Sequence, residues 1–180
     1  MSRRLVAGLV ALIAIGGVFA YGLSKQDAVS TIDTKNVTVP PSGFQTFSAA
    51  AITGTTLDAK AFSLARLEGK PVFINFWGSW CPPCKREAPD LRTFSNGLGD
   101  RAAFVGVAID SPSSDARTFI RKAGWRYPIV SRHCCDLANR YGVTYFPTTI
   151  VVDRRGQVVD RLVGPQTVAR LRAELHALGA

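Results

Sequence analysis

A continuous apolar segment that leads directly into a pair of cysteines constrains the fold more than any other feature of the sequence. Residues 71–77, PVFINFW, form a run of β-forming side chains, which is typical of a strand buried on both faces. Residues 82–97 then have the composition of a helix that contains Pro89. Cys81 and Cys84 are therefore expected where a buried strand gives way to the first turn of a helix.

Two cysteines at the start of a helix are suited to redox chemistry. The unpaired N–H groups and the positive end of the helix dipole stabilise a thiolate, and a free thiol has an ordinary pKa of about 8.5. Cys84 follows Cys81 by one turn, so the pair can close a small disulfide and exchange two electrons through a mixed disulfide. Two alternatives are weaker, because structural zinc needs four suitably spaced ligands and a static disulfide across so short a loop stabilises little.

The rest of the chain alternates strands with helices. Strands are expected at 102–109, 127–130, TTIVVD and QVVDRLVG, helices at 113–122, 136–142 and 166–178, and a β-hairpin region at 47–64. In the last helix an apolar stripe recurs at helical spacing, which is typical of a helix that closes a core. This order predicts an α/β fold with a central sheet and helices on both of its faces.

The N-terminal segment predicts export. Residues 5–23 carry no charge, and as a helix their 19 residues would span about 28 Å, close to the hydrocarbon thickness of a bilayer. Arg3 and Arg4 precede them and orient the N-terminus toward the cytoplasm. We expect a signal anchor, with a cleaved signal peptide as the alternative because residues 18–20 resemble a cleavage site.

These boundaries divide the chain into three parts: the anchor or signal peptide at 1–23, a polar extracytoplasmic linker at 24–46 and a folded domain at 47–180. Either form of the N-terminal segment places the domain outside the cytoplasm, where disulfides persist. The net charge of +9 is scattered, without a basic block interleaved with aromatic residues. We therefore expect a membrane partner for the N-terminal segment, no nucleic-acid partner and no cofactor.

The segment WCPPCKREAP resembles the active-site segment of the thioredoxin superfamily, and TYFPTTIVVDRRG resembles the strand entry at that family's cis-proline. Within the superfamily the chain is most similar to the membrane-anchored TlpA, ResA and DsbE (CcmG)-like thiol-disulfide oxidoreductases. Their shared features are the N-terminal segment, the hairpin before GKPVFINFW and the helix-strand insertion at 113–130. The resemblance covers residues 47–178 and implies a thioredoxin-like fold with a central mixed β-sheet flanked by helices.

The resemblance also implies roles for the matching residues. Cys81, expected nearer the surface, would be the attacking thiol, and Cys84, buried within the helix, would resolve the mixed disulfide. Pro147 would follow a cis peptide bond and lie against the cysteine pair. Phe146 would then turn its backbone toward an incoming substrate segment. An ordinary trans proline that opens an edge strand is the alternative for Pro147.

The residues around the cysteines are expected to tune them and to contact substrate. Trp80 and Pro82 would belong to the substrate-facing surface, whereas Trp77 would pack in the core. Pro82 and Pro83 remove two N–H donors that could stabilise a Cys81 thiolate, and no histidine lies between the cysteines. We therefore expect a disulfide that is hard to reduce, as in a reductant or an isomerase.

A proton carrier is expected at Glu87. Thioredoxins have a buried aspartate six residues before the first cysteine, but this chain has Asn75 there, which cannot carry a proton. Glu87 lies one helical turn after Cys84, and the ResA-like subgroup has a glutamate at this place. Partly apolar surroundings should raise its pKa and suit it to proton transfer with the Cys84 sulfur. A solvated helix residue is the alternative.

A second cysteine pair, Cys134-Cys135, follows His133 and is not required by the subgroup pattern. Three interpretations stay open: a reduced pair with a packing role, an auxiliary redox role, and a soft-metal site for Cu(I). The resemblance as a whole predicts a reductase for disulfides of exported proteins such as apocytochrome c, acting in cytochrome c maturation and re-reduced by a membrane thiol electron donor. Copper delivery to an oxidase, a disulfide-forming oxidant and a peroxidase are the alternatives.

Overall fold

The computed structural model describes residues 45–109, 113–131 and 135–180. The strands are β1 (Phe47–Ser48), β2 (Thr53–Thr55), β3 (Ala61–Ser63), β4 (Val72–Trp77), β5 (Ala103–Ala108), β6 (Ile129–Ser131), β7 (Thr148–Val152) and β8 (Gln157–Val163). The helices are the 3-10 helix η1 (Leu64–Leu67) and the α-helices α2 (Pro82–Asn96), α3 (Ser113–Ala123), α4 (Cys135–Arg140) and α5 (Val168–Ala177). The predicted anchor at 5–23 and most of the predicted linker lie outside the described residues. None of the helices within the described ranges is long and apolar enough to cross a bilayer.

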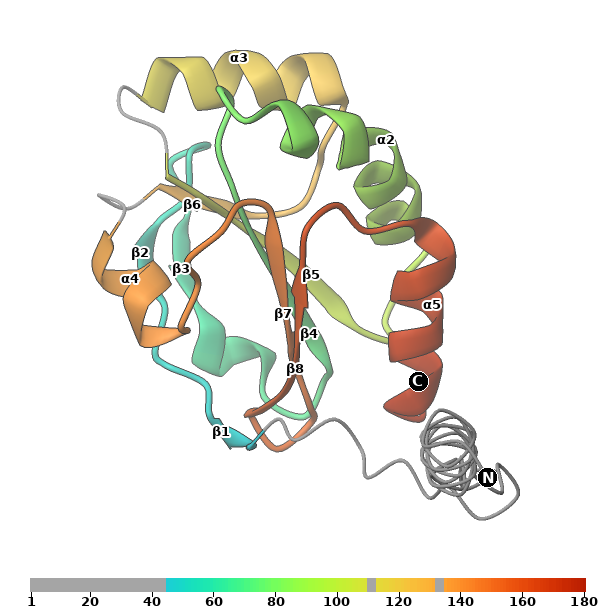
Figure 1. The fold of residues 1–180 in the computed structure, drawn as a ribbon. Coiled ribbons are helices and arrows are strands. Elements are labelled where there is room, and N and C mark those ends of the chain that lie inside the picture. Colours follow the sequence, from blue (N-terminus) through green and yellow to red (C-terminus); the bar gives the residue numbers. More distant parts are fainter. Residues whose placement is uncertain (1–44, 110–112, 132–134) are drawn as a thin grey trace, which may run out of the picture. The chain divides into compact units, whose positions relative to one another are not determined.

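A mixed sheet of six strands forms the centre of the domain, in the order β1-β8-β7-β4-β5-β6 (Figure 1). Strands β4, β5 and β6 are parallel, whereas β7 is antiparallel to β4 and β8 is antiparallel to β7. The predicted central mixed sheet is confirmed. The hairpin region expected at 47–64 is divided, because β2 and β3 pair with each other while β1 pairs with β8.

The buried strand β4 separates two apolar cores. Successive side chains of a strand point to opposite faces, so Phe73 and Trp77 pack with residues of α2, α3 and α5, while Ile74 and Phe76 pack with residues of α4 and the β2–β3 region. Figure 1 shows α2 and α5 on one side of the sheet and α4 with the hairpin on the other. All six residues of β4 are buried, as the sequence predicts. Each large apolar side chain buried in this way contributes about 1.5–3 kcal/mol.

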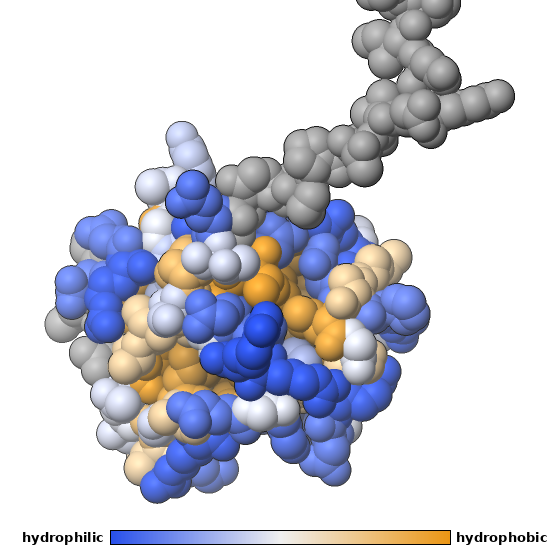
Figure 2. Space-filling view, turned by 90° about the horizontal axis from the view of Figure 1, so that it is seen from below, coloured by the Kyte–Doolittle hydropathy of each residue, from blue (hydrophilic) through white to orange (hydrophobic). Residues whose placement is uncertain are grey.

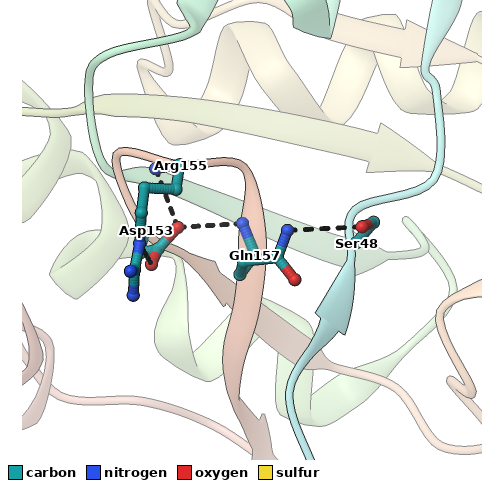
Figure 3. Close-up of polar contacts among 4 residues, drawn as sticks. All are labelled: Ser48, Asp153, Arg155 and Gln157. Atoms are coloured by element: carbon teal, nitrogen blue, oxygen red, sulfur yellow. Dashed lines mark hydrogen bonds and ion pairs between the residues drawn. The ribbon is translucent and has the colours of Figure 1, made fainter.

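The turn between β7 and β8 ties β1 to the sheet at the end of the domain drawn lowest in Figure 1. One carboxylate oxygen of Asp153 accepts hydrogen bonds from the backbone N–H groups of Arg155, at 2.9 Å, and Gln157, at 2.8 Å. The side-chain amide of Gln157 donates to Ser48 Oγ of β1 at 3.2 Å (Figure 3). Seen from below in Figure 2, much of this end is hydrophilic, with smaller apolar patches between the polar residues.

Candidate redox site

The two cysteines form a disulfide at the N-terminus of α2, directly after the buried strand β4. Cys81 is the N-cap residue of α2, and its Cα lies 5.3 Å from the Cα of Cys84. The backbone N–H of Cys84 points at the Cys81 sulfur, with the nitrogen 3.2 Å from Sγ. Pro82 and Pro83 occupy the first helical positions, which need no N–H for the helix itself. The predicted placement at a strand-to-helix junction is confirmed.

Cys81 lies slightly nearer the surface than Cys84, as expected, although both cysteines are buried. In the disulfide form Cys81 is only 2% exposed, and Cys84 is fully buried at 0%. The sulfur of Cys81 lies 3.6 Å from the carbonyl oxygen of Phe146, which belongs to the loop that precedes β7. Because this loop packs against the N-terminus of α2, it covers Cys81 even though Cys81 is the N-cap residue.

The loop before β7 contains the expected cis peptide bond, between Phe146 and Pro147. Pro147 is buried and its carbonyl oxygen accepts a hydrogen bond from the N–H of Gly164 at 2.9 Å. The rings of Phe146 and Trp80 meet edge to face, with centroids 6.3 Å apart. Phe146 therefore links the proline loop to the segment that carries the cysteines.

Exposed apolar side chains lie on the segments that carry the cysteines and the cis-proline. Trp80 is 61% exposed, as expected for a substrate-facing residue, and Pro82 is also exposed. Tyr145 at 70% and Val163 at 58% are the other large exposed apolar side chains among the described residues. The sequence interpretation missed Tyr145 and Val163. Their position next to the cis-proline and its partner strand could have indicated them.

Glu87 is buried, with 2% of its surface exposed, so it is not a solvated helix residue. The side-chain amide of Asn75 on β4 donates to Glu87 Oε1 at 3.1 Å, and the backbone N–H of Gln166 donates to Oε2 at 3.1 Å. Asn75 also donates to Thr149 Oγ1 at 3.1 Å. The sequence interpretation missed Thr149 and Gln166, because both lie more than 60 residues from Glu87 in the chain.

Burial raises the pKa of Glu87 to about 7, although the hydrogen bonds from Gln166 and Asn75 favour the charged form and oppose this effect. The carboxyl can therefore gain or lose a proton near neutral pH. Glu87 follows Cys84 by three residues in the same helix, a spacing that places two side chains on one face. This geometry suits proton transfer to or from the Cys84 sulfur.

Trp77 packs in the core, as predicted. Its ring lies 4.8 Å from that of Trp125 and 4.9 Å from that of Phe119, measured between centroids. Trp77 belongs to the same apolar cluster as Cys81 and Cys84. Its fluorescence is therefore expected to respond to the redox state of the pair.

The predictions for the second cysteine pair stay open. His133 and Cys134 lie outside the described residues, and Cys135 is the first residue of α4. Over the parts of the chain that the structure describes, no group of three or more histidine, cysteine, aspartate or glutamate side chains could hold a metal ion.

Comparison with known proteins agrees with this geometry. The profile of the AhpC/TSA family matches residues 45–161. Thiol-disulfide oxidoreductase ResA of Bacillus thuringiensis (strain Al Hakam) is 32% identical over 126 residues, which cover 69% of this chain and 72% of the relative. A thiol:disulfide interchange protein of Chlorobium tepidum TLS has a TM-score of 0.69 and 28% identity, over 76% of this chain and 99% of that chain. A secreted Mycobacterium tuberculosis disulfide oxidoreductase homologous to DsbE of E. coli has a TM-score of 0.62 and 27% identity, over 71% and 96%.

Proposed function

We propose that this chain reduces disulfides in exported proteins, because it belongs to the AhpC/TSA family and is a thiol-disulfide oxidoreductase of the ResA type. The Cys81 thiolate attacks one sulfur of the substrate disulfide, forms a mixed disulfide and releases the first substrate thiolate. The Cys84 sulfur then attacks the Cys81 sulfur, which closes the Cys81–Cys84 disulfide and releases the second substrate thiolate. The substrate gains two electrons, and the enzyme dithiol is oxidised.

The sparse polar surroundings of the Cys81 sulfur carry this proposal. Among the described residues, the polar contacts of Cys81 Sγ are the N–H of Cys84, at 3.2 Å, and the carbonyl oxygen of Phe146, at 3.6 Å. Pro82 and Pro83 supply no N–H, and a carbonyl oxygen does not stabilise an anion. A strong oxidant stabilises its reduced form, whereas a poorly stabilised thiolate favours the disulfide, so the dithiol gives up its electrons readily.

Glu87 accepts the proton that is released in the second step. When Cys84 attacks, its thiol must lose a proton, and a buried sulfur cannot pass that proton directly to water. A carboxyl with a pKa of about 7, one helical turn away, can accept the proton and later return it when the disulfide is reduced again. Asn75 holds this carboxyl in place without competing for the proton.

The sequence supports the proposed location, and the resemblance implies the proposed substrate and donor. The uncharged segment 5–23 supports a single-pass anchor with the domain on the extracytoplasmic side. There, Cys-x-x-Cys-His segments of c-type apocytochromes carry two thiols that can oxidise before haem attachment. Apocytochrome c, in cytochrome c maturation, is the substrate that the resemblance implies and that we propose, with a membrane thiol protein as the electron donor.

Reaction direction tests the proposal. The reduced full-length chain, in neutral detergent, is mixed with an oxidised Cys-x-x-Cys-His peptide, and the oxidised chain is separately mixed with the reduced peptide. We expect peptide thiols to form in the first reaction and little peptide disulfide in the second, with Cys81→Ser inactive in both. Net oxidation of the reduced peptide would instead identify a disulfide-forming oxidant.

A further inference from the structure

A groove runs between α2 and α3 beside the redox site. The two helices lie side by side along one face of the domain (Figure 1). The space between them has a volume of about 610 Å³, and Ser79 and Lys85 line it at the end near the cysteines. Since Ser79 precedes Cys81 by two residues and Lys85 directly follows Cys84, the groove adjoins the disulfide.

The rim of the groove is basic. Lys85 and Arg92 line it from α2, and Lys122 lines it from α3, against the single carboxylate of Asp115. All three cations are exposed, and within the described ranges their side chains have no hydrogen bond or ion pair. Three like charges around one groove repel one another, so an anionic occupant would relieve this repulsion.

The floor of the groove is apolar and firmly packed. Ala88 on α2 is 6% exposed, and its carbonyl oxygen accepts a hydrogen bond from the indole N–H of Trp125 at 3.0 Å. Phe119 on α3 lies with its ring 4.9 Å from that of Trp77 and 5.2 Å from that of Trp125. The floor can therefore bind an apolar side chain without rearranging.

We propose that this groove binds an acidic segment of the protein substrate, in which carboxylates alternate with an apolar residue. The inference rests on the proposed function, because the bound segment must flank the disulfide that is reduced. Lys85 and Arg92 are two helical turns apart, about 10 Å, which is the length of about three residues in an extended segment. Acidic residues would meet the basic rim and the apolar residue would meet Ala88 and Phe119. Basic segments would be repelled, which gives selectivity among substrates.

Three peptides test the proposal. Each peptide carries the same small disulfide loop with a six-residue arm on each side. The arms of the first peptide consist of aspartate and leucine, those of the second of lysine and leucine, and those of the third of serine and leucine. Their reduction by the reduced full-length chain is followed by tryptophan fluorescence. We expect the aspartate arms to be reduced about tenfold faster than the lysine arms at low salt. The ratio should approach one in about 1 M salt, where charges are screened within about 3 Å.

Charge reversal at the far end of the groove provides the matched comparison. Arg92→Glu with Lys122→Glu should invert the order of the aspartate and lysine peptides, whereas Arg66→Glu with Arg172→Glu, two exposed cations outside the groove, should keep it. Parent rates equal within about twofold, or a parental order that survives in the groove variant, would overturn the proposal.

The peptide with serine arms distinguishes failure of the proposed reductase function from failure of the groove proposal. If the parent chain fails to reduce it, the proposed function is wrong, and the groove is then judged by binding alone. For that purpose the fluorescence anisotropy of a labelled, cysteine-free aspartate-leucine peptide is measured with the full-length chain. Binding that weakens about tenfold in the Arg92→Glu, Lys122→Glu variant supports the groove, and equal binding to both forms rejects it.

Discussion

The side-chain amide of Asn75 donates a hydrogen bond to Glu87 Oε1 at 3.1 Å and thereby fixes a buried carboxyl one helical turn from Cys84. A second hydrogen bond from the same amide group, to Thr149 Oγ1, holds Asn75 between β4 and β7. Thioredoxins have an acid where this chain has Asn75. Here the strand supplies a donor and the helix supplies the acid, one turn after Cys84.

Asn75→Ala removes a donor that favours the charged form of Glu87, and its pKa should rise above about 7. Loss of one hydrogen bond to a charged group corresponds to a pKa change of about one unit or more. The rate of peptide-disulfide reduction is measured from pH 5 to 9. The midpoint of this pH profile should move upward by that amount. Asn96→Ala, at an exposed position at the end of α2, serves as the control. An unchanged midpoint in Asn75→Ala would show that this hydrogen bond does not set the titration.

The stability of the oxidised protein should fall as the pH rises. The folded protein retains a proton on Glu87 that the unfolded chain releases, because the pKa is about 7 in the fold against an ordinary value of 4.5. The stabilising contribution is complete below about pH 4.5 and is lost as the pH rises through about 7, which amounts to about 3 kcal/mol.

Urea unfolding at a series of pH values measures this loss. Glu87→Gln should lack this component of the pH dependence, whereas Glu68→Gln, at an exposed site, should follow the parent. Parent and Glu87→Gln curves that run parallel from pH 4.5 to 8.5 would contradict the assignment.

Cys84→Ser should accumulate a mixed disulfide between Cys81 and a substrate peptide. Cys81 ends the strand-to-helix turn beside the exposed Trp80, whereas Cys84 lies fully buried in the first turn of α2. Mass spectrometry of the reduced variant after incubation with the disulfide peptide should show one added peptide chain. Cys81→Ser should show none, and an adduct on Cys84 there would reverse the assigned roles.

Gly106→Ala should destabilise the fold. A Cβ at this position on β5 would lie 2.9 Å from Ile129 Cγ1 and 3.2 Å from Trp77 Nε1, inside a packed core. Overpacking of this kind costs about 1–3 kcal/mol, and chemical denaturation measures it. Gly97→Ala is the matched control, because its Cβ would come no closer than 3.4 Å to any neighbour, and we expect a change within about 0.5 kcal/mol. Equal stability of the two variants would contradict the packing argument.

Much of the fold could be predicted because its signals are local. The apolar run at 71–77 and the helix after Cys81 each depend on neighbouring residues, and both lie within one or two residues of their predicted bounds. Pro147 follows a cis bond, as the resemblance implies. Trp80 is exposed and Trp77 is buried, as expected.

Features that depend on contacts distant in the sequence could not be predicted. The N–H of Gln166 reaches Glu87 across 79 positions, and β1 pairs with β8 rather than with its neighbour in sequence. The contact between Cys81 and the carbonyl oxygen of Phe146 also spans 65 positions, and it is expected only from the resemblance. No periodicity or motif near Glu87 indicates its contact with Gln166.

The reduction potential of the Cys81–Cys84 pair tests the central claim most directly. The full-length chain, and a control in which Cys134 and Cys135 are both replaced by serine, are equilibrated in redox buffers and followed by the fluorescence of Trp77 and Trp80. The sparse donors around the Cys81 sulfur predict a potential near that of thioredoxin, about −270 mV, or below it. A value near about −120 mV would contradict the account and identify the protein as a disulfide-forming oxidant.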